Sequence, residues 1–210
     1  MKKWKNITNT TKAIRKKWLL LCIVMCFAGT QILYGQASWE LNLLRNINPM
    51  HPAGTVWDGI STTAKPISVL IPAGIMTAAL INHDKNSKQK AIEIGASIFI
   101  SAATTSIMKQ LVKRDRPANV YADIYPDKPD NGYAFPSGHV SVSFATAASL
   151  SIQYKKWYIT LPAYLWSTSV AYSRLYLGQH YPSDVLMGAA TGIGSAYASH
   201  WLNKKLFHKK

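Results

Sequence analysis

Apolar and polar segments alternate along this chain, and no segment shows the two-residue alternation typical of a half-buried strand. Six stretches are apolar or nearly so, at 18–34, 66–82, 91–108, 140–153, 157–172 and 184–202. A helix satisfies its backbone hydrogen bonds within one segment, so such runs can cross a membrane. The pattern predicts an all-α fold, a polytopic membrane helical bundle of five or six spans.

The first apolar run has two interpretations. Residues 1–17 are polar, with seven Lys or Arg and no acid, and residues 35–37 (Gly-Gln-Ala) form a small-x-small sequence. This arrangement is typical of a cleaved signal peptide, but an uncleaved first membrane helix can have the same basic head. We therefore expect residues 1–37 to be an N-terminal signal peptide or first membrane helix, and residues 38–210 to form the functional domain.

Two other stretches carry local signals. Residues 38–65 are amphipathic and irregular. A short helix, either at the membrane interface or packed in an ordinary way, is predicted by Trp39, Leu41, Leu43, Leu44 and Ile47, and Pro49, Pro52 and Gly54 interrupt it. The last apolar run is full of small residues, and its Gly188 and Gly192 form a GxxxG pair. Such a pair predicts close packing between helices in lipid.

Positive charge is concentrated between the apolar runs. The chain has 24 Lys and Arg against 9 Asp and Glu, a formal net charge of +15. In a soluble protein this excess would suggest a nucleic-acid partner, but blocks of charge between apolar runs indicate a membrane instead. If each run crosses once, 16 of the 24 cations fall in alternate segments, at 1–17, 82–90, 154–156 and 203–210. The positive-inside rule makes these segments cytoplasmic, so we expect a multi-pass protein of a bacterial inner membrane.

The hydropathy leaves one alternative open. The mean hydropathy is −0.02, which is low for a polytopic protein, and several runs are short and rich in Ser, Thr, Ala and Gly. A soluble all-helical protein is therefore a second interpretation of the same pattern.

Residues suited to anion chemistry occur in three clusters beside the ends of apolar runs. They are Lys109 to Pro117 with Arg116, Pro136-Ser137-Gly138-His139, and Ser173-Arg174 followed by His180 and Asp184. Each alone has an ordinary explanation, such as a histidine at a helix start or an interfacial arginine. Together, and on one expected membrane face, they combine cations that hold an anion with a nucleophile and an acid.

The spacing of these clusters resembles the complete tripartite signature of the type 2 phosphatidic acid phosphatase (PAP2) superfamily. That superfamily also contains bacterial acid phosphatases and vanadium haloperoxidases. The signature covers 76 of the 210 residues and no motif position departs from it. The resemblance implies a PAP2-type phosphatase domain over residues 38–210, with its active site at one membrane face, here the periplasmic one.

The resemblance also implies the catalytic roles. His180 would attack phosphorus to give a phosphohistidine, and Asp184 would hold the other nitrogen of its ring. His139 would be the general acid that protonates the leaving oxygen. Pro182 predicts that a helix begins near Ser183, which puts the carboxylate in its first turn.

Phosphate-binding roles follow in the same way. Lys109, Arg116 and Arg174 would clamp the phosphoryl oxygens. Ser137 and the backbone N–H groups of Gly138 and the next residue would add the anion site of a helix start. No metal and no cofactor is required by this scheme.

The expected activity is hydrolysis of a phosphate or diphosphate on a membrane lipid. Candidate substrates are phosphatidic acid, phosphatidylglycerol phosphate, undecaprenyl diphosphate and the phosphates of lipid A. Three alternatives stay open: a soluble periplasmic acid phosphatase of broad specificity, a vanadium haloperoxidase, and a non-catalytic lipid-binding membrane protein. Lys113 and Arg114 lie outside the signature; they either attract an anionic headgroup or lie at the membrane interface, and we favour the second.

Overall fold

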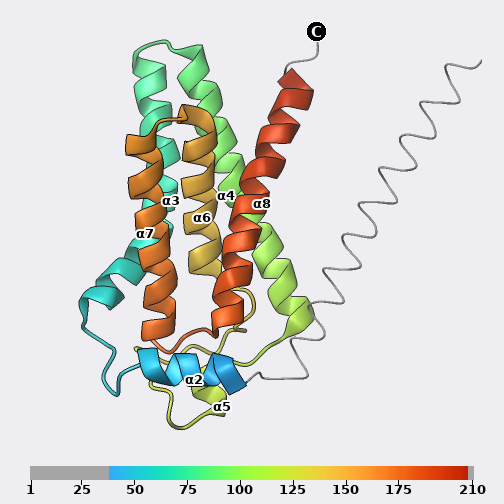
Figure 1. The fold of residues 1–210 in the computed structure, drawn as a ribbon. Coiled ribbons are helices and arrows are strands. Elements are labelled where there is room, and N and C mark those ends of the chain that lie inside the picture. The colour runs from blue at the N-terminus through green and yellow to red at the C-terminus, as the bar shows by residue number, and fades with distance from the viewer. Residues whose placement is uncertain (1–37, 208–210) are drawn as a thin grey trace, which may run out of the picture. The chain divides into compact units, whose positions relative to one another are not determined.

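Every regular element in the described residues, 38–207, is a helix (Figure 1). In this computed structural model the chain from Glu40 onward forms one compact unit. Its elements are α2 (Ser38–Ile47), α3 (Val56–Ile81), α4 (Lys85–Val112), α5 (Pro117–Val120), α6 (Gly138–Tyr154), α7 (Trp157–Tyr176) and α8 (Pro182–Phe207). The predicted all-α fold is confirmed, whereas the prediction for residues 1–37 concerns a part of the chain outside the described residues.

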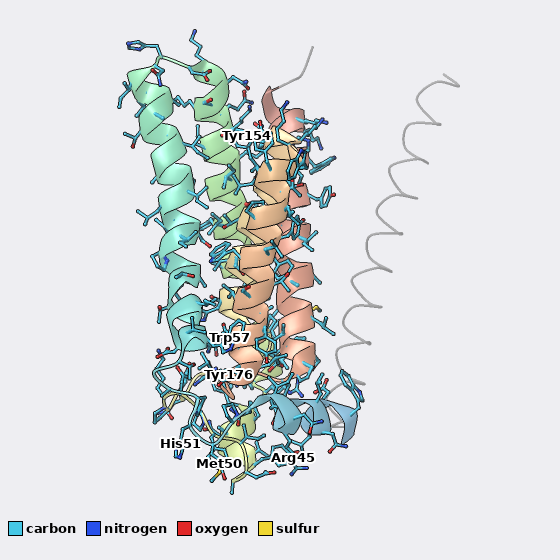
Figure 2. All side chains as sticks on the ribbon, turned by 60° about the vertical axis from the view of Figure 1, so that its left-hand side comes forward. Arg45, Met50, His51, Trp57, Tyr154 and Tyr176 are labelled. Carbon is cyan, nitrogen blue, oxygen red and sulfur yellow. The ribbon has the colours of Figure 1, made fainter. Side chains whose placement is uncertain are left out.

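The five long helices alternate in direction, so their ends gather at two opposite faces of the bundle (Figure 1). α3, α6 and α8 begin, and α4 and α7 end, at the face that α2 lies across. Figure 2 shows Trp57 and Tyr176 near this end and Tyr154 near the other. All three predicted motifs adjoin the face that α2 lies across, because each is attached to one of these helix ends.

Two helices begin earlier than the apolar pattern predicts. α3 begins at Val56 rather than near 66, with Pro66 and Pro72 inside it. Proline is tolerated within membrane helices, where neighbouring helices and hydroxyl side chains re-satisfy the freed backbone groups. α4 begins at Lys85 rather than 91, because the Asp84 side chain caps it by accepting from two backbone N–H groups.

α6 is the central helix of the bundle and packs against α3, α4, α7 and α8. Its buried positions carry mostly Ala, Ser and Thr. Hydroxyls join it to α4: Thr105 Oγ1 donates to Ser141 Oγ at 2.9 Å, and Ser149 Oγ donates to Ser97 Oγ at 2.6 Å. Polar contacts between helices therefore take the place of large apolar side chains, which explains the low hydropathy.

A buried carboxylate joins three helices at the opposite end from α2. Glu93 of α4 is 5% exposed and accepts hydrogen bonds from Gln153 of α6 and from Asn203 of α8. His200 Nδ1, also on α8, lies 2.7 Å from Glu93 Oε1. The one acid in this apolar stretch is thus satisfied by partners on its neighbours.

Two segments are long and apolar enough to cross a membrane, Val56–Ile81 and Lys85–Val120. Both carry exposed apolar side chains on their outer surfaces, among them Val69, Leu70, Phe99 and Ile107. Outward-facing apolar side chains on such helices are what a lipid environment favours.

The GxxxG pair of α8 lies directly against α6. A Cβ added at Gly192 would lie 2.8 Å from the Ala145 backbone nitrogen, and even closer to the Ser141 carbonyl oxygen. A Cβ at Gly188 would lie 2.7 Å from the Ser137 carbonyl oxygen. The predicted close approach of helices at these glycines is confirmed.

We expect Gly192→Ala to destabilise the protein by about 1–3 kcal/mol, because the added methyl overlaps the α6 backbone. Thermal unfolding in detergent should show a melting temperature lower by several degrees. Gly194→Ala is the matched control on the same helix, since a Cβ there meets nothing within 4 Å. Equal melting temperatures for the two variants would contradict the close packing of α8 on α6.

Candidate active site

The second motif forms the start of α6. Ser137 occupies the N-cap position, and its backbone N–H donates to the Asp184 carbonyl oxygen at 3.0 Å. The Ser137 hydroxyl is buried without a hydrogen-bond partner among the described residues. The first N–H groups of a helix have no partner inside the helix and attract anions. This turn therefore presents a hydroxyl and free N–H groups while its backbone is fixed to α8.

His180 lies in the short connection between α7 and α8 and is 2% exposed. Its Nδ1 faces the fully buried Asp184, with 3.5 Å between Nδ1 and Oδ2, which is a close approach without the geometry of a hydrogen bond. Its Nε2 faces Arg116, 3.5 Å from Nη1. Hydrogen bonds at active sites often shorten only when substrate binds. The ring thus has one nitrogen directed at a carboxylate and the other at a cation.

Arg116 is held on three sides. Its Nε donates to the Gly132 carbonyl oxygen at 3.0 Å, and its Nη1 donates to the backbone and side-chain oxygens of Gln179, both at 2.9 Å. Its Nη2 lies 2.5 Å from Asp130 Oδ2. The guanidinium is 7% exposed, so these contacts fix its position beside the Nε2 of His180.

Arg174 and Lys109 are held more sparsely. Arg174 Nη1 donates to Ser61 Oγ at 2.6 Å, and its Nε is buried without a partner among the described residues. Lys109 Nζ donates to the carbonyl oxygens of Tyr133 and Ala134. Both cations therefore retain donor capacity for an anion.

The charge around His180 keeps its ring neutral. The pKa of His180 lies well below its ordinary value, because burial disfavours the charged ring and Arg174, Arg116 and Lys109 add positive charge around it. Asp130 acts in the opposite direction and does not reverse the shift. A neutral imidazole has a free lone pair, so the ring is prepared to act as a nucleophile near neutral pH.

His139 follows Gly138 in the first turn of α6 and is half-buried. Its ring makes no hydrogen bond within residues 38–207, which leaves it able to donate to a substrate oxygen. The structure thus brings the eight predicted site residues to one end of the bundle.

Arg114 is the residue that the sequence analysis placed wrongly. We expected a membrane-interface side chain, but Arg114 is 9% exposed and its Nη1 lies 2.7 Å from Asp184 Oδ1. Its Nη2 lies 2.9 Å from Glu40 Oε2 on α2. The physical reason is that a buried carboxylate needs a counter-charge, and Arg114 supplies one in direct contact with Asp184.

Other supporting residues carry no sequence signal. Gln179, which orients Arg116, also donates to Asp127 Oδ1 at 2.5 Å. Ser61 lies 113 positions before its partner Arg174. Ser61 belongs to no motif, and only the fold brings it to the site. Gln179 directly precedes His180 in the chain, but nothing in the sequence indicates its contact with Arg116.

Residues that bind metals do not gather here. Within the described part of the chain, no group of three His, Cys, Asp or Glu side chains is placed to hold a metal ion. The charged donors around His180 are the cations Arg174, Arg116 and Lys109, which suit an anion such as phosphate.

Comparisons with known proteins show similarity to one family. The family model of the PAP2 superfamily matches residues 90–207. A lipid A 4'-phosphatase of Bacteroides thetaiotaomicron is 31% identical over 179 residues, covering 80% of this chain and 78% of that protein.

Two solved structures have a similar fold. The crystal structure of Aquifex aeolicus LpxE has a TM-score of 0.62 at 26% identity, covering 77% of this chain and 94% of that one. A transmembrane PAP2 type phosphatidylglycerolphosphate phosphatase of Bacillus subtilis has a TM-score of 0.66 at 18% identity, covering 91% of this chain and 98% of that one. With the two apolar segments above, this likeness in fold confirms the predicted membrane helical bundle.

We expect Asp130→Asn to strengthen phosphate binding roughly two- to fivefold, since a partly exposed pair of this kind contributes up to about 1 kcal/mol. Asp130 competes with an incoming phosphate for Arg116, which its other partners would still hold in place. Calorimetric titration with inorganic phosphate measures the change. Asp123→Asn is the control, because that carboxylate pairs with Arg45 instead. Equal affinities for both variants would contradict the competition.

Proposed function

Because this chain belongs to the PAP2 superfamily, we propose that it is a membrane phosphatase that removes phosphate from a lipid through a phosphohistidine. The observation that carries this proposal is the buried, neutral ring of His180, surrounded by three cations and directed at Asp184. A structural histidine needs no such surroundings, whereas a nucleophile for a phosphate dianion does.

Substrate binding comes first. Arg116, Arg174 and Lys109 bind the phosphoryl oxygens, together with the Ser137 hydroxyl and the first N–H groups of α6. The buried and unpaired Ser137 Oγ and Arg174 Nε support these roles, since a bound phosphate would satisfy both. These charges are fixed before the reaction, so they stabilise negative charge that develops on the transferred group.

Transfer to the enzyme follows. The Nε2 lone pair of His180 forms a bond to phosphorus while the bond from phosphorus to the leaving oxygen breaks. His139 donates a proton to that oxygen, so the lipid leaves as an alcohol, or as a monophosphate when the substrate is a diphosphate. Asp184 stabilises the positive charge that the imidazole acquires.

Hydrolysis completes the cycle. Water attacks phosphorus and gives a proton to His139, which the first step left neutral. The N–P bond breaks, its electron pair returns to Nε2, and inorganic phosphate leaves. Both histidines end in their starting protonation states, so the cycle needs no other reactant.

A lipid A phosphate is the best-supported substrate. The relative that matches four-fifths of this chain is a lipid A 4'-phosphatase. Phosphatidic acid, phosphatidylglycerol phosphate and undecaprenyl diphosphate are the alternatives to compare with it.

The first experiment measures phosphate release by the detergent-purified protein, in EDTA, from these four lipids and from para-nitrophenyl phosphate. We expect lipid A to be hydrolysed fastest. We expect His180→Ala to lower the rate by 10³-fold or more, because loss of the nucleophile removes the covalent route. His51→Ala replaces an exposed histidine and is the control.

The outcomes separate the alternatives. Release from the soluble ester alone would indicate an acid phosphatase instead. Full activity in His180→Ala would contradict the phosphohistidine route, and the absence of release from any substrate would contradict the enzyme.

We further propose that the site faces the periplasm of a bacterial inner membrane. The support is the charge pattern: 16 of 24 cations lie in segments assigned to the side away from the motifs. Exposed residues are available on both sides, with Lys128 in the loop before α6 and Lys88 in the first turns of α4.

Cysteine labelling tests this orientation. In a chain with Cys22→Ser and Cys26→Ser, an impermeant maleimide added to intact spheroplasts should label Lys128→Cys and leave Lys88→Cys unlabelled. After lysis both should react. The reverse pattern in intact cells would put the site on the cytoplasmic side.

A further inference from the structure

Arg114 forms a buried bridge between α2 and the residue that orients the proposed nucleophile. Its Nη1 donates to Asp184 Oδ1 and to Ser183 Oγ, both at 2.7 Å. Its Nη2 donates to Glu40 Oε2 at 2.9 Å. The side chains of Arg114 and Glu40 are 8% and 6% exposed, so little solvent screens the contact.

The guanidinium is also fixed in its plane. It lies over the ring of Tyr181, with 3.9 Å from Cζ to the ring centroid. A stacked guanidinium with two carboxylate partners has one defined orientation, which an ammonium group could not reproduce.

α2 is anchored to the loops of the site independently of this bridge. Leu44 packs in a buried cluster with Ile124 and Tyr181. Asn48 donates to the carbonyl oxygens of Tyr125 and Tyr176, at 2.8 Å each. α2 is therefore held against the connection that carries His180, and Glu40 is held at its distance from Arg114.

We propose that Arg114 is a positioning residue for the reaction and that Glu40 sets how much of its charge acts on Asp184. The proposal rests on the proposed function. Asp184 divides its charge between two sides: Oδ1 accepts from Arg114, while Oδ2 accepts from the Tyr181 N–H at 2.9 Å and faces His180. Any positive charge that Glu40 does not balance draws the carboxylate away from the imidazole.

Other charged residues face His180 and Asp184, and none of them is changed in the variants tested. Lys109, from α4, acts on Asp184 and on His180. Arg174, from α7, acts on His180, as do Arg116 and Asp130 from the loop between α4 and α6. None of these contacts Glu40.

The test compares the pH dependence of kcat/KM between the wild type and two variants. The fall of kcat/KM at low pH, the acid limb, reports proton uptake by the His180–Asp184 pair. Glu40→Gln leaves the full charge of Arg114 on Asp184, so the pair should take up its proton at lower pH. Arg114→Gln removes that charge, so the limb should move to higher pH. We expect opposite shifts of about half a pH unit or more, with KM changed less than kcat. Ionisation of the substrate is common to all variants and cancels in the comparison.

Controls separate charge from anchoring. Arg45→Gln breaks the exposed pair with Asp123, which also joins α2 to the loop, and should leave the limb in place. Combining Glu40→Gln with Arg114→Gln should give a limb between those of the two single variants, because the two removed charges act on Asp184 with opposite signs.

Two failures are distinguishable. No turnover by the wild-type protein overturns the proposed function. An active wild type with an unshifted limb in Glu40→Gln, or shifts of the same sign in both single variants, overturns the role of Arg114. Glu40→Gln is nearly isosteric and keeps a hydrogen-bond acceptor for Arg114, so this decision does not depend on whether Arg114→Gln folds.

Discussion

The structure depends on holding three cations together in a place with little water. Lys109, Arg116 and Arg174 repel one another, and burial makes that repulsion stronger. The protein offsets it with one carboxylate, Asp130, on Arg116 and with oxygen dipoles: backbone carbonyls hold Lys109 and Arg116, and the Ser61 hydroxyl holds Arg174. Dipoles position a cation without cancelling its charge, so the site stays positive and ready for an anion.

The same use of hydroxyls explains how this bundle packs. α6 has few large side chains to bury, yet it lies at the centre, because Ser, Thr and Gly allow helices to approach closely and then to form hydrogen bonds. A scale that counts Ser and Gly as polar therefore underestimates how well these helices suit a membrane. Two segments pass such a test, Val56–Ile81 and Lys85–Val120, yet α7 exposes as many large apolar side chains as α3 does.

Sequence alone predicted the parts that depend on short spacing. Lys109 and Arg116, or His180 and Asp184, lie a few residues apart, and the alternation of apolar runs brings them to one face. The starts of helices were predicted less well. Proline usually interrupts a helix, but Pro66 lies inside α3, a segment apolar enough to cross a membrane. The partners were not predictable: Glu40 and Arg114 are 74 positions apart, and only the placement of α2 across the bundle brings them together.

The contact between the starts of α6 and α8 has a consequence for how substrate range can change. Gly188 admits the Ser137 carbonyl, and the Ser137 N–H returns a hydrogen bond to Asp184, so these two turns form one rigid block. That block carries His139, the proposed general acid, on one side, and Asp184, which faces the proposed nucleophile His180, on the other. α3 contacts the site through Ser61, which accepts a hydrogen bond from Arg174. Divergence or engineering can therefore reshape α3 for a new headgroup while the spacing between the two histidines stays the same.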